Sequence, residues 1–411
     1  MSDGSSSSVT QEDPEAPQAQ SAGPWIEIGW VVVPDATGAL ADHVREAARR
    51  VEDRLRQDFR RYRFRSVILE RQLPVEGRVR ELVDLIDLGE QEREAAHWDF
   101  VCAVTEDDLR AVDKPFALGA PASSMNACVL SVARLRPADE LHGDTLDGPP
   151  LPTRIAALFF HLFGHLNDLP HGREPEDFMY APRDPTDLDR MQRFSEQGMA
   201  MLDEELRKEA DPRVEEEPGK RTALRFYLES TWRNREDIVH SIAKARPWTF
   251  VLRLSRMATT AASTLIILML TAEAWDLGTS QSPVAVAAAS LLAVLLTTTY
   301  VLRRQGLLGR LRRDPLTEQR VASDVSVGLI VATAMATTYA CLFLLSLAIA
   351  ELVFPAAMLQ DWATHSAPID QRDYLTMAGF VATLGVLLGA LGASFEGEKY
   401  FRHAAVVDEE T

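Results

Sequence analysis

Four apolar stretches in the second half of the chain constrain its fold more than any other feature. They lie near Met257–Trp275, Pro283–Leu302, Val325–Ala350 and Tyr374–Ser394, and each is close to the roughly 20 residues that a helix needs to cross a bilayer. Residues 251–411 carry 11 Lys/Arg and 14 Asp/Glu, whereas the first 250 residues carry 32 and 47. A single water-soluble globule is therefore excluded. The sequence predicts a polar domain followed by an all-α, four-span transmembrane bundle.

Basic residues in the predicted loops set the orientation of the spans. Six arginines lie between the second and third spans, in Arg303–Arg320, and the links after the first and third spans share only Arg372. The approach to the first span adds four basic residues, Lys244, Arg246, Arg253 and Arg256. We therefore expect an integral, multi-pass protein of the lipid bilayer with cytoplasmic N and C termini. Residues 1–24 lack an apolar core, so we expect a disordered tail and no signal peptide.

The predicted bundle has few features of a transport pathway. Its acidic residues Glu273, Asp324 and Glu351 lie at predicted span ends, whereas transporters usually place ionisable groups inside the bilayer. Gly385 and Gly389 form a GxxxG pair, a pattern that suits close helix packing. The bundle is therefore interpreted as an anchor, and the glycine pattern leaves a homo-oligomer through the membrane helices open.

Charge and cysteine content exclude two further classes of protein. The chain has 43 basic and 61 acidic residues, a net charge of -18, so it lacks the basic excess of a nucleic-acid-binding protein and we expect no nucleic-acid partner. Three cysteines, Cys102, Cys128 and Cys341, are too few for a disulfide framework or a four-thiolate zinc site.

Strand-like and helix-like segments alternate in the polar region. Runs of β-formers predict strands, among them Trp25–Val33, Phe100–Val104 and Ala127–Ala133, and apolar residues at helical spacing predict helices that include Ala39–Phe59 and Thr153–Asn167. This alternation predicts an α/β sandwich with a mixed sheet. The chain then divides into a disordered tail (1–24), the α/β domain (25–205), a cytoplasmic connector helix (206–250), four transmembrane helices (251–396) and a cytoplasmic tail (397–411).

Three histidines at the end of one predicted helix carry the pattern most typical of chemistry. His161 and His165 are four residues apart, so their imidazoles share one helix face and can meet one tetrahedral cation. His171 can join them only if the chain turns sharply, and Asn167-Asp168 tolerate the left-handed conformation that such a turn needs. Three neutral imidazoles and a water would form a metal site with an open position. The alternative is that hydrogen bonds alone hold the three rings.

The histidine segment resembles a known zinc motif. HLFGHLNDLPH (His161–His171) is similar to the extended HExxHxxGxxH motif of metzincins, and Met179 lies eight residues further on, where archaemetzincins have a methionine. Three further segments resemble archaemetzincin sequences, namely DFVCAVTEDDL (Asp99–Leu109), VLSVARLRP (Val129–Pro137) and FSEQGMAML (Phe194–Leu202). The resemblance covers about residues 25–205.

This resemblance implies a zincin-like (metzincin) α/β domain with a single Zn²⁺ site. The expected metal ligands are His161, His165 and His171, and Met179 is expected to pack beneath them as a structural residue. The edge strand that would hold an extended peptide or protein ligand is expected at four consecutive residues, Val129, Leu130, Ser131 and Val132.

The departures from the family pattern concern the chemistry. Leu162 occupies the position of the general-base glutamate, and Asp168 replaces the motif's glycine. The four cysteines of the family's second, structural zinc site correspond to Gly172, Asp177, Gln197 and Ala200, so that site is expected to be lost. Leucine can neither accept a proton nor bind a water, and we therefore expect no catalytic residue at this position.

Three functions remain open from the sequence. The leading hypothesis is a membrane-anchored, cytoplasm-facing pseudopeptidase that binds zinc and acts by binding or sensing a peptide or protein. The first alternative is an active zinc metallopeptidase with a non-standard base, for which Asp168, Glu174, Glu176 and Tyr180 are the nearby residues. The second alternative is a membrane transport protein with a regulatory soluble domain.

Overall fold

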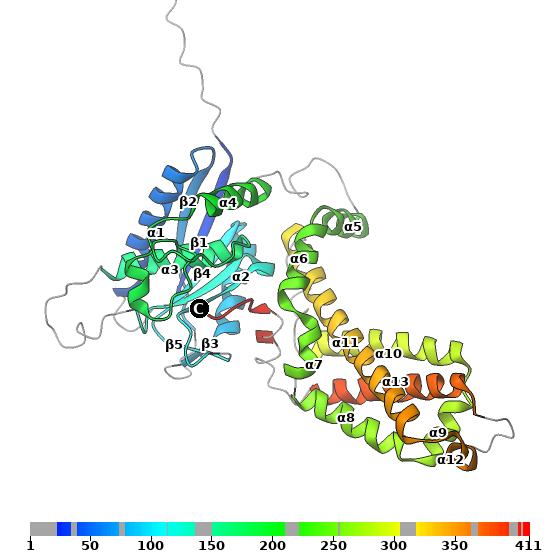
Figure 1. The fold of residues 1–411 in the computed structure, drawn as a ribbon. Helices are drawn as coiled ribbons and strands as arrows, with labels where there is room; N and C mark the ends of the chain where they lie inside the picture. The colour runs from blue at the N-terminus through cyan, green and yellow to red at the C-terminus, as the bar shows by residue number, and fades with distance from the viewer. Residues whose placement is uncertain are drawn as a thin grey trace, which may run out of the picture.

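The computed structural model describes residues 23–33, 39–73, 79–112, 114–135, 150–209, 222–253, 255–304, 318–362, 369–393, 402–403 and 406–411. All but the last two residues of the predicted disordered tail lie outside this set, and so does most of the arginine-rich loop. Figure 1 shows an α/β domain at one end of the molecule and an elongated group of helices at the other.

The α/β domain is built on a five-stranded sheet of order β2-β1-β4-β7-β6. Its strands are β2 (Arg63–Glu70), β1 (Trp25–Val33), β4 (Phe100–Thr105), β7 (Ala127–Ser131) and β6 (Gly119–Ala122). The first four are parallel, and β6 pairs with β7 in the antiparallel direction. The predicted mixed sheet is therefore present. A separate two-stranded sheet joins β3 (Val79–Glu81) and β5 (Asp108–Arg110).

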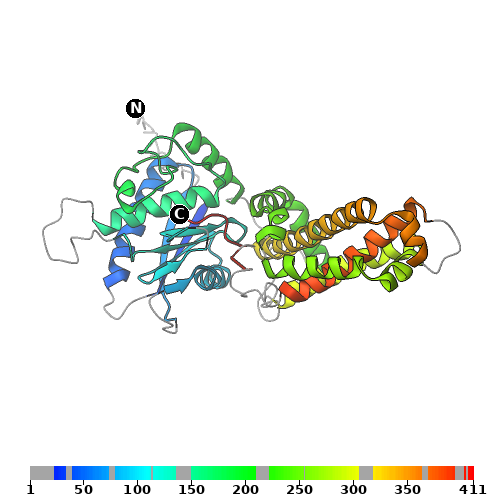
Figure 2. The ribbon, with the colours of Figure 1, turned by 60° about the horizontal axis from the view of Figure 1, so that its bottom comes forward.

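Helices cover both faces of the sheet (Figures 1 and 2). α1 (Ala39–Asp58) and α3 (Leu151–Leu166) pack on one face, and α2 (Leu82–Ala96) packs on the other. Successive strand residues point to opposite faces, so in β1 Trp30 belongs to the first core and Val31 to the second. Because both faces are covered, the central strands are almost entirely apolar.

The edge of the sheet differs from the sequence prediction. The assignment of Val129, Leu130, Ser131 and Val132 to the edge is wrong, because β7 is hydrogen-bonded to β4 on one side and to β6 on the other, and Val132 lies beyond its end. The edge strand is β6, with the sequence GAPA. Gly119 and Pro121 give β6 little strand propensity, but an edge position suits Pro121 because proline has no amide hydrogen to donate.

The connector consists of two helices rather than one. α5 (Ala223–Arg233) and α6 (Arg235–Ala245) meet at Asn234, and a short turn, η5 (Pro247–Thr249), and α7 (Phe250–Arg253) follow. On the α/β side, α4 (Glu196–Glu209) follows the turn η3 (Pro185–Asp189). The domain boundaries given above stay predictions.

Three helices are long and apolar enough to cross a membrane, or four if one bent pair is counted. The three are α10 (Pro283–Arg304), α11 (Glu318–Val353) and α13 (Gln371–Ala393). The first predicted span is broken at residues 270–271 into α8 (Ser255–Met269) and α9 (Ala272–Thr279), which are bent by 88°. The indole nitrogen of Trp275 donates to the Met269 carbonyl at 2.9 Å and so satisfies a free carbonyl at the end of α8. A further short helix, α12 (Ala356–Trp362), follows α11.

The helices pack through small residues and interhelical hydrogen bonds. A Cβ added at Gly389 of α13 would lie 3.2 Å from the Ala261 Cβ of α8, so the GxxxG face is used within the chain. The Ser290 hydroxyl of α10 lies 2.8 Å from the Tyr339 hydroxyl of α11 and 3.0 Å from the Thr383 hydroxyl of α13. These contacts hold three helices together through groups that would be costly to leave unpaired in lipid.

The α/β domain and the long helices share a border that carries acidic groups. Burial, together with the charge of Glu94 and of Asp87 and Asp324, raises the pKa of Glu90 on α2 to about 7. Asp324 belongs to α11, and Asp87 forms an ion pair with Arg402. The protonated form of Glu90 is therefore the one that the folded protein favours.

This shift predicts a stability that falls with rising pH. Because the folded pKa lies above the ordinary value of 4.5, the stabilisation is complete at low pH and is lost as the pH rises through about 7. Between pH 5 and pH 8 we expect the free energy of unfolding of the unmodified protein to fall by about 1–3 kcal/mol more than that of Glu90→Gln. Thermal unfolding in detergent, with the exposed Glu204→Gln on α4 as control, measures the difference. Parallel curves for unmodified protein and Glu90→Gln would contradict this reading.

Candidate metal centre

The helix α3 fixes the first two histidines. Nearly all of its residues are buried, and Pro152 in its first turn has a backbone angle suited to a helix start. Arg154 anchors the same end, since its guanidinium donates twice to the Asp189 carboxylate and once to the Leu135 carbonyl, each at 2.7 Å. His161 and His165 at the other end are therefore presented from a rigid element.

The turn after α3 brings the third histidine back under the helix. Asp168 has a φ of 60°, the left-handed conformation predicted for this position. The Leu169 amide donates to the Gly164 carbonyl at 2.9 Å and closes the turn. Aspartate is therefore tolerated at the position where the motif has glycine, because Asp is among the few residues that adopt this conformation readily.

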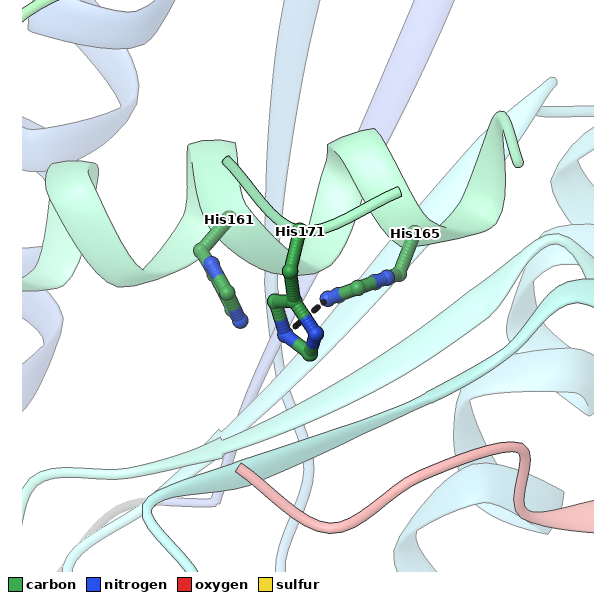
Figure 3. Close-up of side chains that lie close together, drawn as sticks. All are labelled: His161, His165 and His171. Atoms are coloured by element: carbon green, nitrogen blue, oxygen red, sulfur yellow. Dashed lines mark hydrogen bonds between the residues drawn. The ribbon is translucent and has the colours of Figure 1, made fainter. Parts of the chain in front are cut away.

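The three imidazoles converge on one point (Figure 3). The Nε2 atoms of His165 and His171 lie 3.1 Å apart, and each histidine offers one ring nitrogen within 4.8 Å of the other two. Two nitrogens bound to one tetrahedral zinc at 2.0–2.1 Å would lie about 3.3 Å apart. Zinc would therefore need an inward movement of the His161 ring of at most about 1.5 Å.

The orientation of His161 leaves one nitrogen for a ligand. Its Nδ1 lies 2.8 Å from the Phe178 carbonyl, to which it donates, so the lone pair is on Nε2. That Nε2 is buried and has no hydrogen-bond partner. A buried nitrogen without a partner is costly, and a metal ion would satisfy it. The donor set therefore fits Zn²⁺.

Met179 lies directly against the metal helix. It is buried, and a Cβ added at Gly164 would come within 2.2 Å of its sulfur. The absence of a side chain at Gly164 thus lets Met179 pack closely against α3 at this position. The Asp177 carboxylate accepts from the Met179 amide at 2.9 Å and holds this loop.

Burial keeps the helical histidines neutral. It lowers the pKa of His161 to about 4, although the bond to the Phe178 carbonyl acts in the opposite direction. It lowers the pKa of His165 to about 2, with further contributions from the neighbouring imidazoles and from Lys244 and Lys114. Neutral imidazole is the form that binds a metal, so these rings need lose no proton near neutral pH.

No general base lies beside the three histidines at the position where the motif has glutamate. Leu162 is fully buried, and its side chain packs against Gly119 of the edge strand. The Asp168 carboxylate lies 3.1 Å from the Lys244 ammonium, and Glu174 lies 4.0 Å from Arg193. Among the described residues, the group of converging donors contains the three histidines and no carboxylate.

Two residues near the site are not visible from the sequence. The Lys244 ammonium of α6 donates to the His165 carbonyl at 2.8 Å and to the Ser123 hydroxyl at 3.1 Å. The Glu409 carboxylate lies 3.8 Å from Nε2 of His171. These residues lie 79 and 238 positions from their histidine partners, and no motif marks either of them. The acidic run Asp408–Glu410 is the only sequence signal that points to Glu409.

The positions that correspond to the second zinc site hold no thiol. Gly172 and Asp177 lie side by side, since a Cβ added at Gly172 would come within 2.7 Å of the Asp177 carboxylate. Gln197 and Ala200 lie on α4. Hydrogen bonds thus fix this loop, as the Gly172 amide donates to the Met179 carbonyl at 2.7 Å.

Solved structures similar to this chain include two archaemetzincins and a zinc-dependent peptidase. One is archaemetzincin from Methanopyrus kandleri (20% identity, 44% of this chain and 96% of that chain, TM-score 0.36). Another is a zinc-dependent peptidase from Methanocorpusculum labreanum (21% identity, 43% of this chain and 99% of that chain, TM-score 0.34). A third is archaemetzincin from Archaeoglobus fulgidus complexed with malonate (17% identity, 43% of this chain and 99% of that chain, TM-score 0.32). The sequence matches no protein-family model and no curated protein. At these identities, the similarity fixes none of this chain's chemistry.

The site predicts one bound zinc ion per chain. Full-length protein in detergent should retain zinc after dialysis, and His161→Ala/His165→Ala should weaken binding at least about 100-fold because two of three donors are lost. Elemental analysis and competition with a chromogenic chelator measure stoichiometry and affinity. His43→Ala on α1 is the control. Equal zinc content in the double variant and the control would remove the site.

Proposed function

We propose that this protein is a membrane-anchored zinc-binding domain that binds an extended peptide and does not cleave it. The observation that carries the proposal is the fully buried Leu162 beside three converging imidazoles. Zinc bound there would polarise a carbonyl or lower the pKa of a bound water. Hydrolysis further requires a group that takes the proton of the water and delivers it to the leaving amine.

The edge strand β6 supports a peptide-binding role. It is the outer strand of the sheet, and the metal helix lies against it through Leu162. An extended peptide can pair with such an edge through backbone hydrogen bonds. Zinc at the triad would lie next to this peptide, so the site combines a main-chain docking edge with one metal-binding point.

Glu409 favours the alternative of an active peptidase, because it is a carboxylate close to His171. The segment that carries it argues against that role. The Leu118 and Gly119 amides both point to the Thr411 carbonyl, at 2.6 and 3.4 Å, so this segment uses the hydrogen-bonding groups of the sheet edge. A substrate paired with β6 would displace Glu409. The carboxylate and the substrate therefore exclude each other.

The membrane topology that we propose has four crossings and a cytoplasmic α/β domain. Residues 406–411 form hydrogen bonds with β6, so both lie on the same side of the membrane, and this requires an even number of crossings. Three long helices give an odd number. These contacts support the bent pair α8–α9 as the fourth crossing, and the arginine-rich loop supports a cytoplasmic α/β domain.

The helices themselves are proposed to anchor the domain. In the described parts of the three long helices, charged residues such as Glu351, Arg372 and Asp373 lie near helix ends. Three of the polar residues in the middle are joined through Ser290, which lies within hydrogen-bond distance of Tyr339 and Thr383. Transport would need groups that face a pathway, so an anchor agrees better with these contacts.

The proposal predicts that zinc-loaded, full-length protein cleaves no peptide. The same result is expected for Asp408→Asn/Glu410→Gln, in which the competing segment is released from the edge. Leu162→Glu introduces a base next to the zinc and should raise cleavage at least about 100-fold above any background. A fluorogenic peptide library measures the rates. Chelator-sensitive cleavage by either of the first two proteins, absent from His165→Ala, would establish a peptidase.

Four crossings predict the side on which Ser280 lies. In a Cys341→Ser background, Ser280→Cys between α9 and α10 should react with an impermeant maleimide on intact cells, because one crossing separates it from the cytoplasm. Asp42→Cys on α1 should react only after permeabilisation. Protection of both cysteines in intact cells would make α8–α9 a re-entrant pair and would overturn the four-crossing topology.

A further inference from the structure

Residues 407–411, which have no regular secondary structure, follow the free edge of β6 and form main-chain hydrogen bonds with it (Figures 1 and 2). The Asp408 amide donates to the Pro121 carbonyl at 3.1 Å, and the Thr411 amide donates to the Gly119 carbonyl at 2.9 Å. The partner number on β6 falls as the number in this segment rises, so the two run antiparallel. The segment therefore occupies the surface at which an extended peptide would bind.

Two acidic side chains fasten this segment on one side. The Asp408 carboxylate accepts from the amide and the hydroxyl of Ser123, both at 2.7 Å, and lies 3.4 Å from the Lys244 ammonium. The Glu410 carboxylate accepts from the amides of Val112 and Lys114 and lies 3.0 Å from His403. Both carboxylates are buried. Charged acceptors with this many donors make strong contacts, so the docking is specific.

The residue between these two, Glu409, lies beside the metal centre. Its carboxylate lies 3.8 Å from Nε2 of His171. Two donors of one tetrahedral zinc lie about 3.3 Å apart, so the carboxylate must come about 0.5 Å closer to His171. It must also come closer to the other two histidines, because it lies outside the group of donors within 4.8 Å of one another. Its side chain is 41% exposed, which leaves it free to make this movement.

We propose that residues 406–411 are a built-in occupant of the peptide edge and that Glu409 supplies the fourth donor of the metal site. This inference rests on the metal centre proposed above and adds a segment of the same chain that regulates it. In the docked state the open metal position is filled by a carboxylate, and the edge amides are paired. A peptide from another protein must displace this segment, so an extended acidic peptide similar to Val406–Thr411 is the partner that the surface fits.

Hydrogen–deuterium exchange on the metal-free, full-length protein tests the docking. The Leu118 and Gly119 amides should exchange slowly in the unmodified protein and at least about 10-fold faster in Asp408→Asn/Glu410→Gln. Adding a capped VVDEET peptide to that variant should restore the slow exchange. Fast exchange in the unmodified protein, or equal exchange in the variant, would overturn the docking regardless of metal.

Cobalt substitution tests the role of Glu409. In Co²⁺-loaded protein, azide titrated into the visible absorption band should bind at least about 10-fold more tightly to Glu409→Gln than to unmodified protein, because the carboxylate no longer holds the open position. Glu196→Gln, an exposed carboxylate at the start of α4, is the matched control. Equal azide affinity in all three proteins would overturn the donor role. Failure to bind Co²⁺ would overturn the metal centre and the donor role together, and the exchange measurement would still decide the docking.

Discussion

The Lys244 ammonium contacts the elements that surround the metal centre. Lys244 lies on α6, the helix that leads toward the membrane helices, and it contacts oxygen atoms of His165, Asp168, Ser123 and Asp408. These atoms belong to the metal helix, the turn after it, the end of the edge strand and the docked segment. A single charge that satisfies four acceptors from separate elements sets their relative positions, because none can move without leaving a partly buried charge underpaired.

The site combines a complete set of metal donors with an incomplete set of catalytic groups. The helix, the left-handed turn at Asp168 and the bond from His161 to the Phe178 carbonyl all serve to aim three nitrogens. Leu162 instead adds apolar contact with the edge strand. A carboxylate does come near the triad, but it arrives on a segment that competes with any peptide for the same strand. The docked segment and any peptide ligand would therefore use the same edge of the sheet.

Local patterns were enough to predict the mixed sheet, the metal helix and the turn that returns His171. The helix follows from the apolar residues at helical spacing in Thr153–Asn167, and the turn follows from the conformational preferences of Asn167-Asp168. The edge strand was mistaken because GAPA has little β-propensity, whereas ACVLS has much. The break in the first predicted span lies within an apolar run, so a hydropathy profile of the sequence does not detect it. The Glu409 contact joins residues 238 apart and depends on tertiary structure alone.

The length of α11 has a mechanical consequence. Its 36 residues measure about 54 Å, whereas the hydrocarbon core is about 30 Å thick, so about 24 Å of stiff helix projects beyond it. The projecting part packs against η1 (Ser123–Met125), the short turn that follows the edge strand. Spans tilt when bilayer thickness changes, and a tilt of about 10° would swing this arm by about 4 Å. In the proposed topology that displacement is close to the spacing of two paired strands.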